Sequence, residues 1–293
     1  MQLGVDTYKR AHVLVALDDE GRQLGTRAIP NTPAGWAEAL AWARGQQQQR
    51  HRRWGVENGG SLGKGFAQFL LAQGEAAVLE VRPQRTAQYR RRGRTQDKTD
   101  QADALAIARL LLAEGAHLPT IQRDDRSTEL RLLSDHRDSL LVDRTRLINQ
   151  RHAQMLQVDP GYQARSGPLT RRRGLHYCRD LALPVADGVA QTRLLIIRQL
   201  TGQILRAEEE IATVTAALGE RVRASQTPIL TLCGVGDVIA ARLLGEMGTV
   251  PRVHSAAALA ALAGVSPVAV SSGGRGGYRL NRGGTVSSTG SST

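Results

Sequence analysis

The sequence predicts an N-terminal α/β domain over residues 1–120, a helical arm over 121–224 and a small, mostly α domain over 225–293. Two observations predict the first domain. Strand-like apolar runs, three of them consecutive, give way to alternating helical and strand patterns. Acidic residues also lie at the ends or on the faces of these elements, namely Asp6, Glu57, Asp100 and Asp103.

The N-terminal elements follow a recognisable order. Strands are expected over residues 3–5, 12–17, 23–29, 53–56 and 76–81. Helices are expected over residues 33–45, between the fourth and fifth strands, and from about residue 99. Turn residues at 18–21 separate the second strand from the third. Three consecutive strands followed by alternating helices and strands are typical of a ribonuclease-H-like layout.

The acidic residues indicate a metal site. Mg²⁺ prefers oxygen ligands, and a pair of such ions can stabilise the attacking and leaving oxygens of a phosphoryl transfer. Asp100 and Asp103 are three residues apart, so both face one side of a helix. Any one of these carboxylates has an ordinary structural interpretation, because acidic residues also favour helix N-termini. Their joint placement with Asp6 and Glu57 predicts a Mg²⁺ site.

The basic residues indicate a nucleic-acid partner. The formal net charge of +12 fits a polyanion, because phosphate neutralisation dominates nucleic-acid affinity. Aromatic residues make up 3% of the chain, so contacts from arginine are expected rather than base stacking. The densest arginines fall in an expected loop before the acidic helix, at Arg90, Arg91, Arg92 and Arg94. Lys9 and Lys98 flank the acidic residues and offer compact charges for phosphate oxygens.

Several other classes of protein are not expected. The chain has no uninterrupted apolar stretch of membrane-spanning length and no lipidation motif, so no membrane partner is expected. Met1 runs almost directly into the first strand, which leaves no room for a signal peptide. Cys178 and Cys233 are widely separated and match no redox or metal spacing. The expected location is the cytoplasm.

The second and third parts differ from the first in pattern. Residues 126–158 and 190–218 show helical spacing without a strand pattern, which predicts a long antiparallel pair or coiled-coil arm joined by a basic connector. Its role is open between a spacer, a dimerisation surface and a nucleic-acid docking surface. Gly234 and Gly236 suggest a helix-hairpin-helix, in which backbone N–H groups approach a DNA phosphate, or a plain tight turn. A helix is expected over 255–263, followed by a Gly- and Ser-rich segment.

Two groups of motifs resemble one known family. The first contains Asp6 with Lys9, Val56-Glu57-Asn58-Gly59, Val81-Arg82-Pro83 and Lys98-Thr99-Asp100-Gln101-Ala102-Asp103-Ala104. The second contains Gly234-Val235-Gly236, Leu244-Gly245-Glu246-Met247-Gly248, Leu262-Ala263-Gly264-Val265-Ser266-Pro267 and Ser272-Gly273. In this order they resemble the DEDD transposases of the insertion sequence 110 family.

The resemblance implies a DNA transposase or site-specific recombinase of a prokaryotic mobile element, associated with the nucleoid. It implies a RuvC-like N-terminal domain that binds Mg²⁺ and a C-terminal domain with a nucleophilic serine. Ser272 best matches that serine, and Ser271 is the alternative. The implied partners are double-stranded DNA at the element ends and target, a structured guide RNA, and further copies of the chain. The residues expected to contact nucleic acid are Lys9, Arg90, Arg91, Arg92, Arg94, Lys98, Gly234, Gly236 and Arg275.

The C-terminal end departs from the family pattern. Asn281-Arg282-Gly283-Gly284 is followed by a low-complexity tail, where the family continues with further helices. The departure keeps two other interpretations open. One is a RuvC-like endonuclease that cuts DNA with metal-activated water, and the other is a nucleic-acid-binding remnant that has lost strand transfer.

Overall fold

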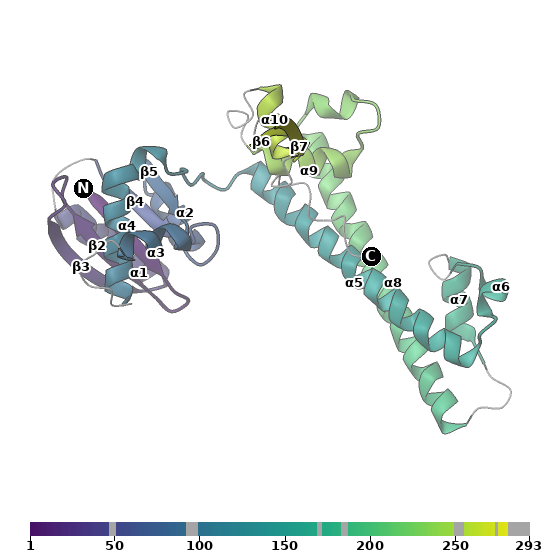
Figure 1. Cartoon of the computed structure of the whole chain (residues 1–293). Coiled ribbons are helices and arrows are strands. Elements are labelled where there is room, and N and C mark those ends of the chain that lie inside the picture. The colour runs from purple at the N-terminus through teal and green to yellow at the C-terminus, as the bar shows by residue number, and fades with distance from the viewer. Residues whose placement is uncertain are drawn as a thin grey trace. The chain divides into compact units, whose positions relative to one another are not determined.

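The computed structural model describes residues 1–46, 51–91, 99–168, 172–182, 187–248, 255–272 and 275–280. The chain forms two compact units, Met1–Asp124 and Asp125–Thr293. Figure 1 shows a mixed α/β first unit and a mainly helical second unit. Residues 281–293, which include the low-complexity tail over 285–293, lie outside the described residues.

The first unit is built on a five-stranded mixed sheet. Its strands are β1(Gln2–Thr7), β2(Ala11–Leu17), β3(Gln23–Pro30), β4(Arg53–Glu57) and β5(Ala77–Val81). They lie in the order β3-β2-β1-β4-β5. The first three strands are antiparallel neighbours, whereas β4 pairs parallel to β1 and β5 parallel to β4. The predicted α/β architecture is therefore confirmed for this unit.

Helices cover both faces of this sheet because its strands bury alternate residues on opposite sides. The helices are α1(Pro33–Gln46), α2(Lys64–Ala72), α3(Pro83–Arg91) and α4(Asp100–Glu114), followed by the 3₁₀ turn η1(Gly115–His117). Leu3 and Val5 of β1 belong to the larger core, with Trp54 and Phe66. Residues of β2 on the opposite side pack with Ala104 and Ala108 of α4.

Glycines let α4 lie directly against the sheet. A Cβ atom added at Gly4 of β1 would stand 2.1 Å from the carbonyl oxygen of Ala104 and 2.4 Å from the amide nitrogen of Ala108. At Gly55 of β4 the same atom would meet Ile107 at 2.9 Å. At Gly4 no side chain fits between the two backbones, and at Gly55 the space is filled by side chains of α4, so close approach favours glycine at both positions.

The first two arginines of the cluster at residues 90–94 lie in a helix and not in the loop that the sequence predicted. Arg90 and Arg91 form the last turn of α3, while Arg92 and Arg94 lie outside the described residues. Pro83 occupies the first helical position, where its missing N–H costs nothing. The helix buries Thr86 and has no apolar stripe, so it shows no hydrophobic periodicity in the sequence.

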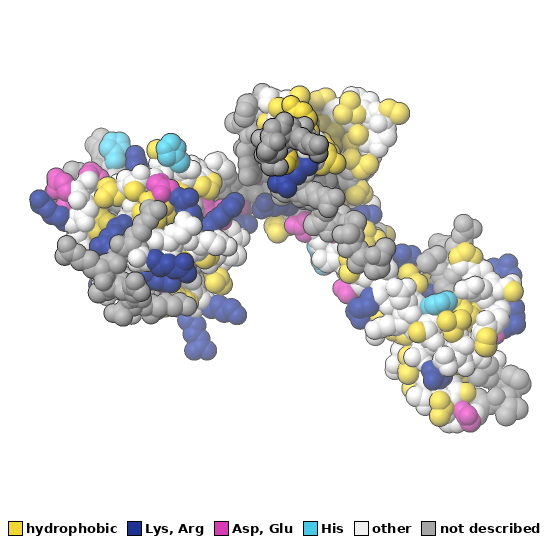
Figure 2. Space-filling model, viewed as in Figure 1, with side chains coloured by type: hydrophobic (Ala, Val, Ile, Leu, Met, Phe, Trp, Pro, Cys, Tyr) yellow, Lys and Arg dark blue, Asp and Glu magenta, His cyan; other side chains and the backbone are white. Residues whose placement is uncertain are grey.

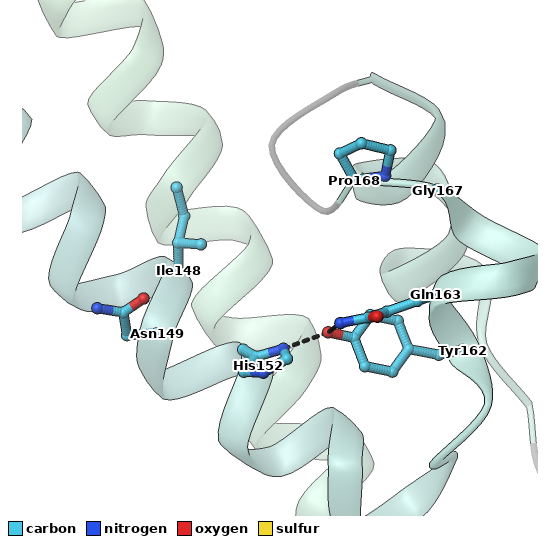
Figure 3. Close-up of a pocket in the computed structure, with 7 residues that line it drawn as sticks. All are labelled: Ile148, Asn149, His152, Tyr162, Gln163, Gly167 and Pro168. Atoms are coloured by element: carbon cyan, nitrogen blue, oxygen red, sulfur yellow. Dashed lines mark hydrogen bonds between the residues drawn. The ribbon is translucent and has the colours of Figure 1, made fainter.

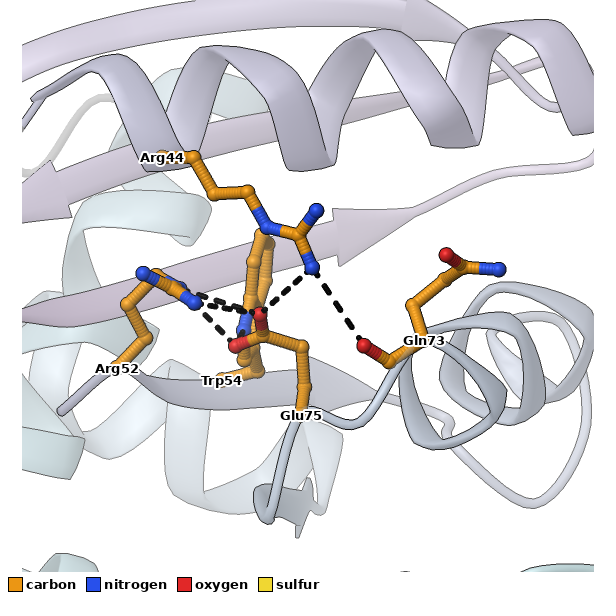
Figure 4. A network of polar contacts seen from close by, with 5 residues as sticks. All are labelled: Arg44, Arg52, Trp54, Gln73 and Glu75. Carbon is orange, nitrogen blue, oxygen red and sulfur yellow. Dashed lines mark hydrogen bonds and ion pairs between the residues drawn. The ribbon is translucent and has the colours of Figure 1, made fainter. Parts of the chain in front are cut away.

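A buried carboxylate joins three elements on one side of the first unit (Figure 4). Glu75 accepts hydrogen bonds from Trp54 Nε1 at 2.9 Å and from Arg52 Nη2 at 2.7 Å, and Arg44 Nη2 lies 3.8 Å away. Burial opposes the charge of Glu75, but these donors outweigh it and hold the pKa of the carboxyl below its usual range. The network ties α1 and β4 to the turn before β5.

The second unit contains an antiparallel pair of long helices, α5(Arg126–Val158) and α8(Gly188–Ala224), as predicted. Successive contacts involve later residues of α5 and earlier residues of α8, as an antiparallel pair requires. Arg137 Nε donates to Thr215 Oγ1 at 2.9 Å, and about two helical turns further along Arg144 Nη2 donates to Glu208 Oε1 at 2.8 Å. Among the described residues, no helix is both long and apolar enough to cross a membrane.

Shorter elements pack at the two ends of this pair. At one end lie α6(Tyr162–Ser166) and α7(Arg172–Asp180), and at the other lies α9(Asp237–Met247). The 3₁₀ turn η2(Pro228–Thr231) precedes α9, and α10(Ala256–Leu262) follows it. The expected helix-hairpin-helix thus has a single 3₁₀ turn as its first member. The chain then forms a hairpin, β6(Pro267–Ser272) and β7(Arg275–Leu280), which the sequence did not predict.

We predict that Gly4→Ala destabilises the first unit, because the new methyl group has no space against the backbone of α4. Overpacking of this kind costs about 1–3 kcal/mol or more. Urea unfolding followed by tryptophan fluorescence measures the effect, because Trp36, Trp42 and Trp54 all belong to this unit. The matched control is Gly45→Ala in α1, where an added Cβ meets open space, and this change should raise stability by up to about 1 kcal/mol. Equal stability of Gly4→Ala and the wild type would contradict the prediction.

Candidate active site

Three of the four predicted carboxylates come together at one edge of the sheet. Asp6 lies near the end of β1, and Glu57 ends the parallel neighbour β4, in which Val56 pairs with Val5. Asp103 lies in the first turn of α4, which packs over both strands. The carboxyl ends of adjacent parallel strands and a helix N-terminus therefore meet at this point.

Asp6 is the central carboxylate of this group. Its side chain is almost fully buried, and its Oδ2 has no hydrogen-bond partner. Burial raises the pKa of Asp6 to about 7, helped by the charge of Glu57, a hydrogen bond shared with Glu57 and the charge of Asp103. Burial and the neighbouring negative charges both destabilise the ionised form of Asp6, since a low dielectric and a like charge each penalise it. Among the described residues, none lowers the pKa of Asp6 through a positive charge.

Asp100 occupies a different position from the other three. It is exposed, and its Oδ1 accepts a hydrogen bond from the hydroxyl of Tyr8 at 3.0 Å. A hydrogen bond from Tyr8 also lowers the pKa of Asp6, so this hydroxyl connects the two carboxylates. Burial and these two charges raise the pKa of the Tyr8 phenol, which keeps it protonated as a donor. Tyr8 was not predicted from the sequence, although it stands two positions after Asp6, on the same side of an extended chain.

The first turn of α4 is set by its N-cap. Thr99 is in an extended conformation and its Oγ1 accepts a hydrogen bond from Ala102 N at 3.1 Å. The cap starts the helix so that Asp100 and Asp103 both fall in the first turn, where the helix dipole favours negative charge. Across the site, Thr7 Oγ1 donates to the carbonyl oxygen of Glu57 at 2.8 Å and holds the end of β4 beside β1.

A guanidinium group occupies part of the site. Arg90 Nη1 donates to Asp103 Oδ1, and the two side chains are 20% and 10% exposed. In this conformation, no three His, Cys, Asp or Glu side chains of the described residues stand close enough to hold a metal ion. The donor set nevertheless fits a hard divalent cation. All the candidate ligands are carboxylates, and Asp6 Oδ2 is buried without a partner.

The predicted nucleic-acid residues are divided between the two units. Lys9 is exposed, beside Asn31, whose Nδ2 donates to the Lys9 carbonyl oxygen at 3.3 Å, and Arg91 is also exposed. Lys98 lies outside the described residues with Arg92 and Arg94. Lys and Arg side chains appear on the visible face of both units (Figure 2).

The two predicted glycines lie in the turn before α9. Gly234 has a φ of +82°, so its left-handed conformation favours glycine, whereas Gly236 is the N-cap of α9 and has no side chain to cap it. Asp237 begins the helix and pairs with Arg223, which places a negative charge at this terminus.

The candidate nucleophile lies at the end of the unpredicted hairpin. Ser272 pairs with Arg275 across β6 and β7, and Ser271 pairs with Gly276. The side chains of both serines and of Arg275 lie outside the described part of the chain.

A pocket in the second unit was also not predicted. It has a volume of about 440 Å³ between α5 and the segment that contains α6. Figure 3 shows His152 of α5 directed at the hydroxyl of Tyr162, with which its Nδ1 forms a hydrogen bond. Its lining residues are Ile148, Asn149, His152, Tyr162, Gln163, Gly167 and Pro168.

Comparison with known proteins identifies the family. A family model described as "Transposase" matches residues 3–160, and the model for the "Transposase IS116/IS110/IS902 family" matches residues 226–287. The chain is 27% identical to the insertion element IS116 uncharacterized 44.8 kDa protein of Streptomyces clavuligerus, over 93% of this chain and 77% of that protein. It is 25% identical to the insertion element IS900 uncharacterized 42 kDa protein of Mycobacterium paratuberculosis, over 92% and 78% respectively. The first family match alone spans more than half of the chain. The chain therefore belongs to the insertion sequence 110 family of transposases, DNA recombination enzymes of mobile insertion elements.

Proposed function

We propose that the first unit is a ribonuclease-H-like, RuvC-like catalytic domain in which Asp6, Glu57, Asp100 and Asp103 hold Mg²⁺ for DNA strand transfer. The observation that carries the proposal is the buried side chain of Asp6. Its Oδ2 has no hydrogen-bond partner, and the carboxylates of Glu57 and Asp103 lie beside it. A bound divalent cation would neutralise these groups and stabilise the developing charge on phosphate oxygens. The strand order β3-β2-β1-β4-β5 supports the fold assignment.

The neighbouring residues have supporting roles in this proposal. Tyr8 orients Asp100 through its hydroxyl and keeps that carboxylate at the edge of the site. Lys9, exposed three positions after Asp6, contacts a DNA phosphate as a point charge. Thr7 keeps Glu57 beside Asp6 by anchoring the backbone of β4.

We further propose that Ser272 supplies the nucleophile, with Ser271 as the alternative. Its oxygen attacks a DNA phosphorus, forms a phosphoserine ester and displaces a deoxyribose oxygen, which leaves with a proton. Serine is a weak nucleophile unless a base, a metal or a positive environment activates it. No histidine is near Ser272 in sequence, since the nearest is His254. Activation at the carboxylate site of the first unit, from the same or a second copy of the chain, is therefore proposed.

The partners follow from charge and composition. A net charge of +12 supports binding of double-stranded DNA at the element ends and target, and of a structured guide RNA that pairs with both. With three tryptophans, five tyrosines and two phenylalanines in 293 residues, the chain has few groups for reading bases by stacking. Sequence choice is accordingly assigned to RNA pairing, and the active form to a homo-oligomer at the prokaryotic nucleoid.

The carboxylates should be indispensable for strand chemistry. Each carboxylate is replaced by the amide of nearly the same shape, in Asp6→Asn, Glu57→Gln, Asp100→Asn and Asp103→Asn. Each change removes an anionic metal ligand, so each should abolish strand transfer while the fold persists. Transfer of a labelled element end in Mg²⁺ measures activity, and circular dichroism checks folding. Wild-type activity in both Asp100→Asn and Asp103→Asn would refute the assignment.

The metal-free protein should lose stability as the pH rises from about 4 to 7. The folded state holds the Asp6 proton up to a pKa of about 7, whereas the unfolded chain releases it near 3.8. Fewer protons are then bound in the unfolded state, and the free energy of unfolding falls by about 1.4 kcal/mol for each pKa unit. Thermal unfolding in chelator at several pH values tests this. Asp6→Asn should flatten the profile, and Mg²⁺ should stabilise the wild type at pH 8 but not this variant.

A covalent intermediate should identify the nucleophile. With DNA, Mg²⁺ and the flanking RNA, the wild type should form a protein–DNA adduct that denaturing electrophoresis resolves, and Ser272→Ala should not. An adduct that persists in Ser272→Ala but disappears in Ser271→Ala moves the nucleophile by one residue. Mg²⁺-dependent cleavage with no adduct in any variant is the result expected of a water-using nuclease.

A further inference from the structure

Arg90 takes a role different from the one that its sequence context suggests. It lies in the last turn of α3, and its guanidinium reaches across to Asp103 in the first turn of α4. Both side chains are largely shielded from water, so solvent and salt screen this pair less than they screen a surface pair. Arg90 therefore neutralises a carboxylate that is also a candidate metal ligand.

One guanidinium cannot satisfy the whole site. It is monovalent and directional, and its contact is with Asp103, while Asp6 Oδ2 remains buried without a partner. A divalent cation would serve several of these oxygens at once. The cation and Arg90 thus compete for Asp103.

Arginine has a second partner available in a DNA-binding enzyme. Its planar fork matches phosphate oxygens as well as carboxylate oxygens. Arg91, the next residue of α3, is exposed, so a nucleic-acid backbone can approach this turn. We propose that Arg90 takes the place of a divalent cation at Asp103 in the free protein, and that the cation binds when Arg90 moves to a phosphate of bound DNA.

This inference rests on the proposed metal site and makes it conditional on substrate. Because Arg90 holds Asp103 in part of the protein, the apparent association constant for the cation is the intrinsic constant multiplied by the fraction of protein in which Asp103 is free. DNA that captures Arg90 raises the cation affinity, and the cation raises the DNA affinity by the same factor, because binding linkage is reciprocal. Metal loading would then follow DNA binding.

The direct test is calorimetric titration of Mn²⁺ into the full chain without DNA. Arg90→Gln should bind Mn²⁺ at least about five-fold more tightly than the wild type, whereas Arg90→Lys, which keeps the charge, should stay near it. The matched control is Arg85→Gln, which breaks an ion pair between Arg85 of α3 and Glu114 of α4 and should leave the Mn²⁺ affinity unchanged. Equal or weaker binding by Arg90→Gln overturns the inference. Absence of Mn²⁺ binding in folded wild type and Arg90→Gln alike contradicts the metal site itself.

Two further measurements locate the effect. In an Asp103→Asn background, Arg90→Gln should no longer change the Mn²⁺ affinity, and a persisting change would place the action of Arg90 elsewhere and overturn the proposal. At fixed ionic strength, Ca²⁺ should tighten binding of a short DNA duplex to the wild type more than to Arg90→Gln. Equal tightening in both proteins would overturn the exchange of Arg90 onto phosphate.

Discussion

The contact between α4 and β1 is the constraint on which the candidate site depends. Gly4 allows the backbone of α4 to lie against the strand, closer than any side chain permits. This approach brings the first turn of the helix to the end of β1, and with it Asp103 to Asp6. At Gly55 of β4, the strand that carries Glu57, the missing Cβ leaves room for the side chains of Ile107 and Leu111 of the same helix. Backbone packing rather than side-chain attraction therefore gathers the carboxylates, since the carboxylates themselves repel.

The charges at the site oppose the fold that brings them together. Burial and like charge hold Asp6 in a state that favours its protonated form, and Arg90 relieves the repulsion at Asp103 without reaching Asp6 Oδ2. Elsewhere in the same unit the buried carboxylate of Glu75 has hydrogen-bond and ion-pair partners, namely two arginines and an indole. The contrast is physical: Glu75 stabilises the fold through its donors, whereas Asp6 is left with unused binding capacity.

The pattern of apolar residues in the sequence predicted the elements whose positions depend on burial. The five strands and the two long helices appear near their expected positions, because short apolar runs give buried strands and apolar residues at helical spacing give α5 and α8. Asp6, Glu57 and Asp103 could be assembled from the sequence because they lie at the ends of such elements. The helix that carries Arg90 could not, because α3 has no apolar stripe, and the role of Tyr8 depends on a hydroxyl contact that spacing does not encode. The β6–β7 hairpin was missed because its Gly-rich composition is equally typical of an irregular segment.

The antiparallel pair of α5 and α8 has a consequence for how this family can vary. Its core is divided into separate clusters, with Leu130 and Leu218 in one, Leu147 and Leu200 in the next, and Met155 and Ile197 beyond them. The helices run in opposite directions, so removing two turns from each at the same level would preserve every pairing on either side. Such a change shortens the pair by roughly 10 Å, at 1.5 Å per residue. The span between its ends is thus a quantity that evolution can adjust while both ends keep their packing.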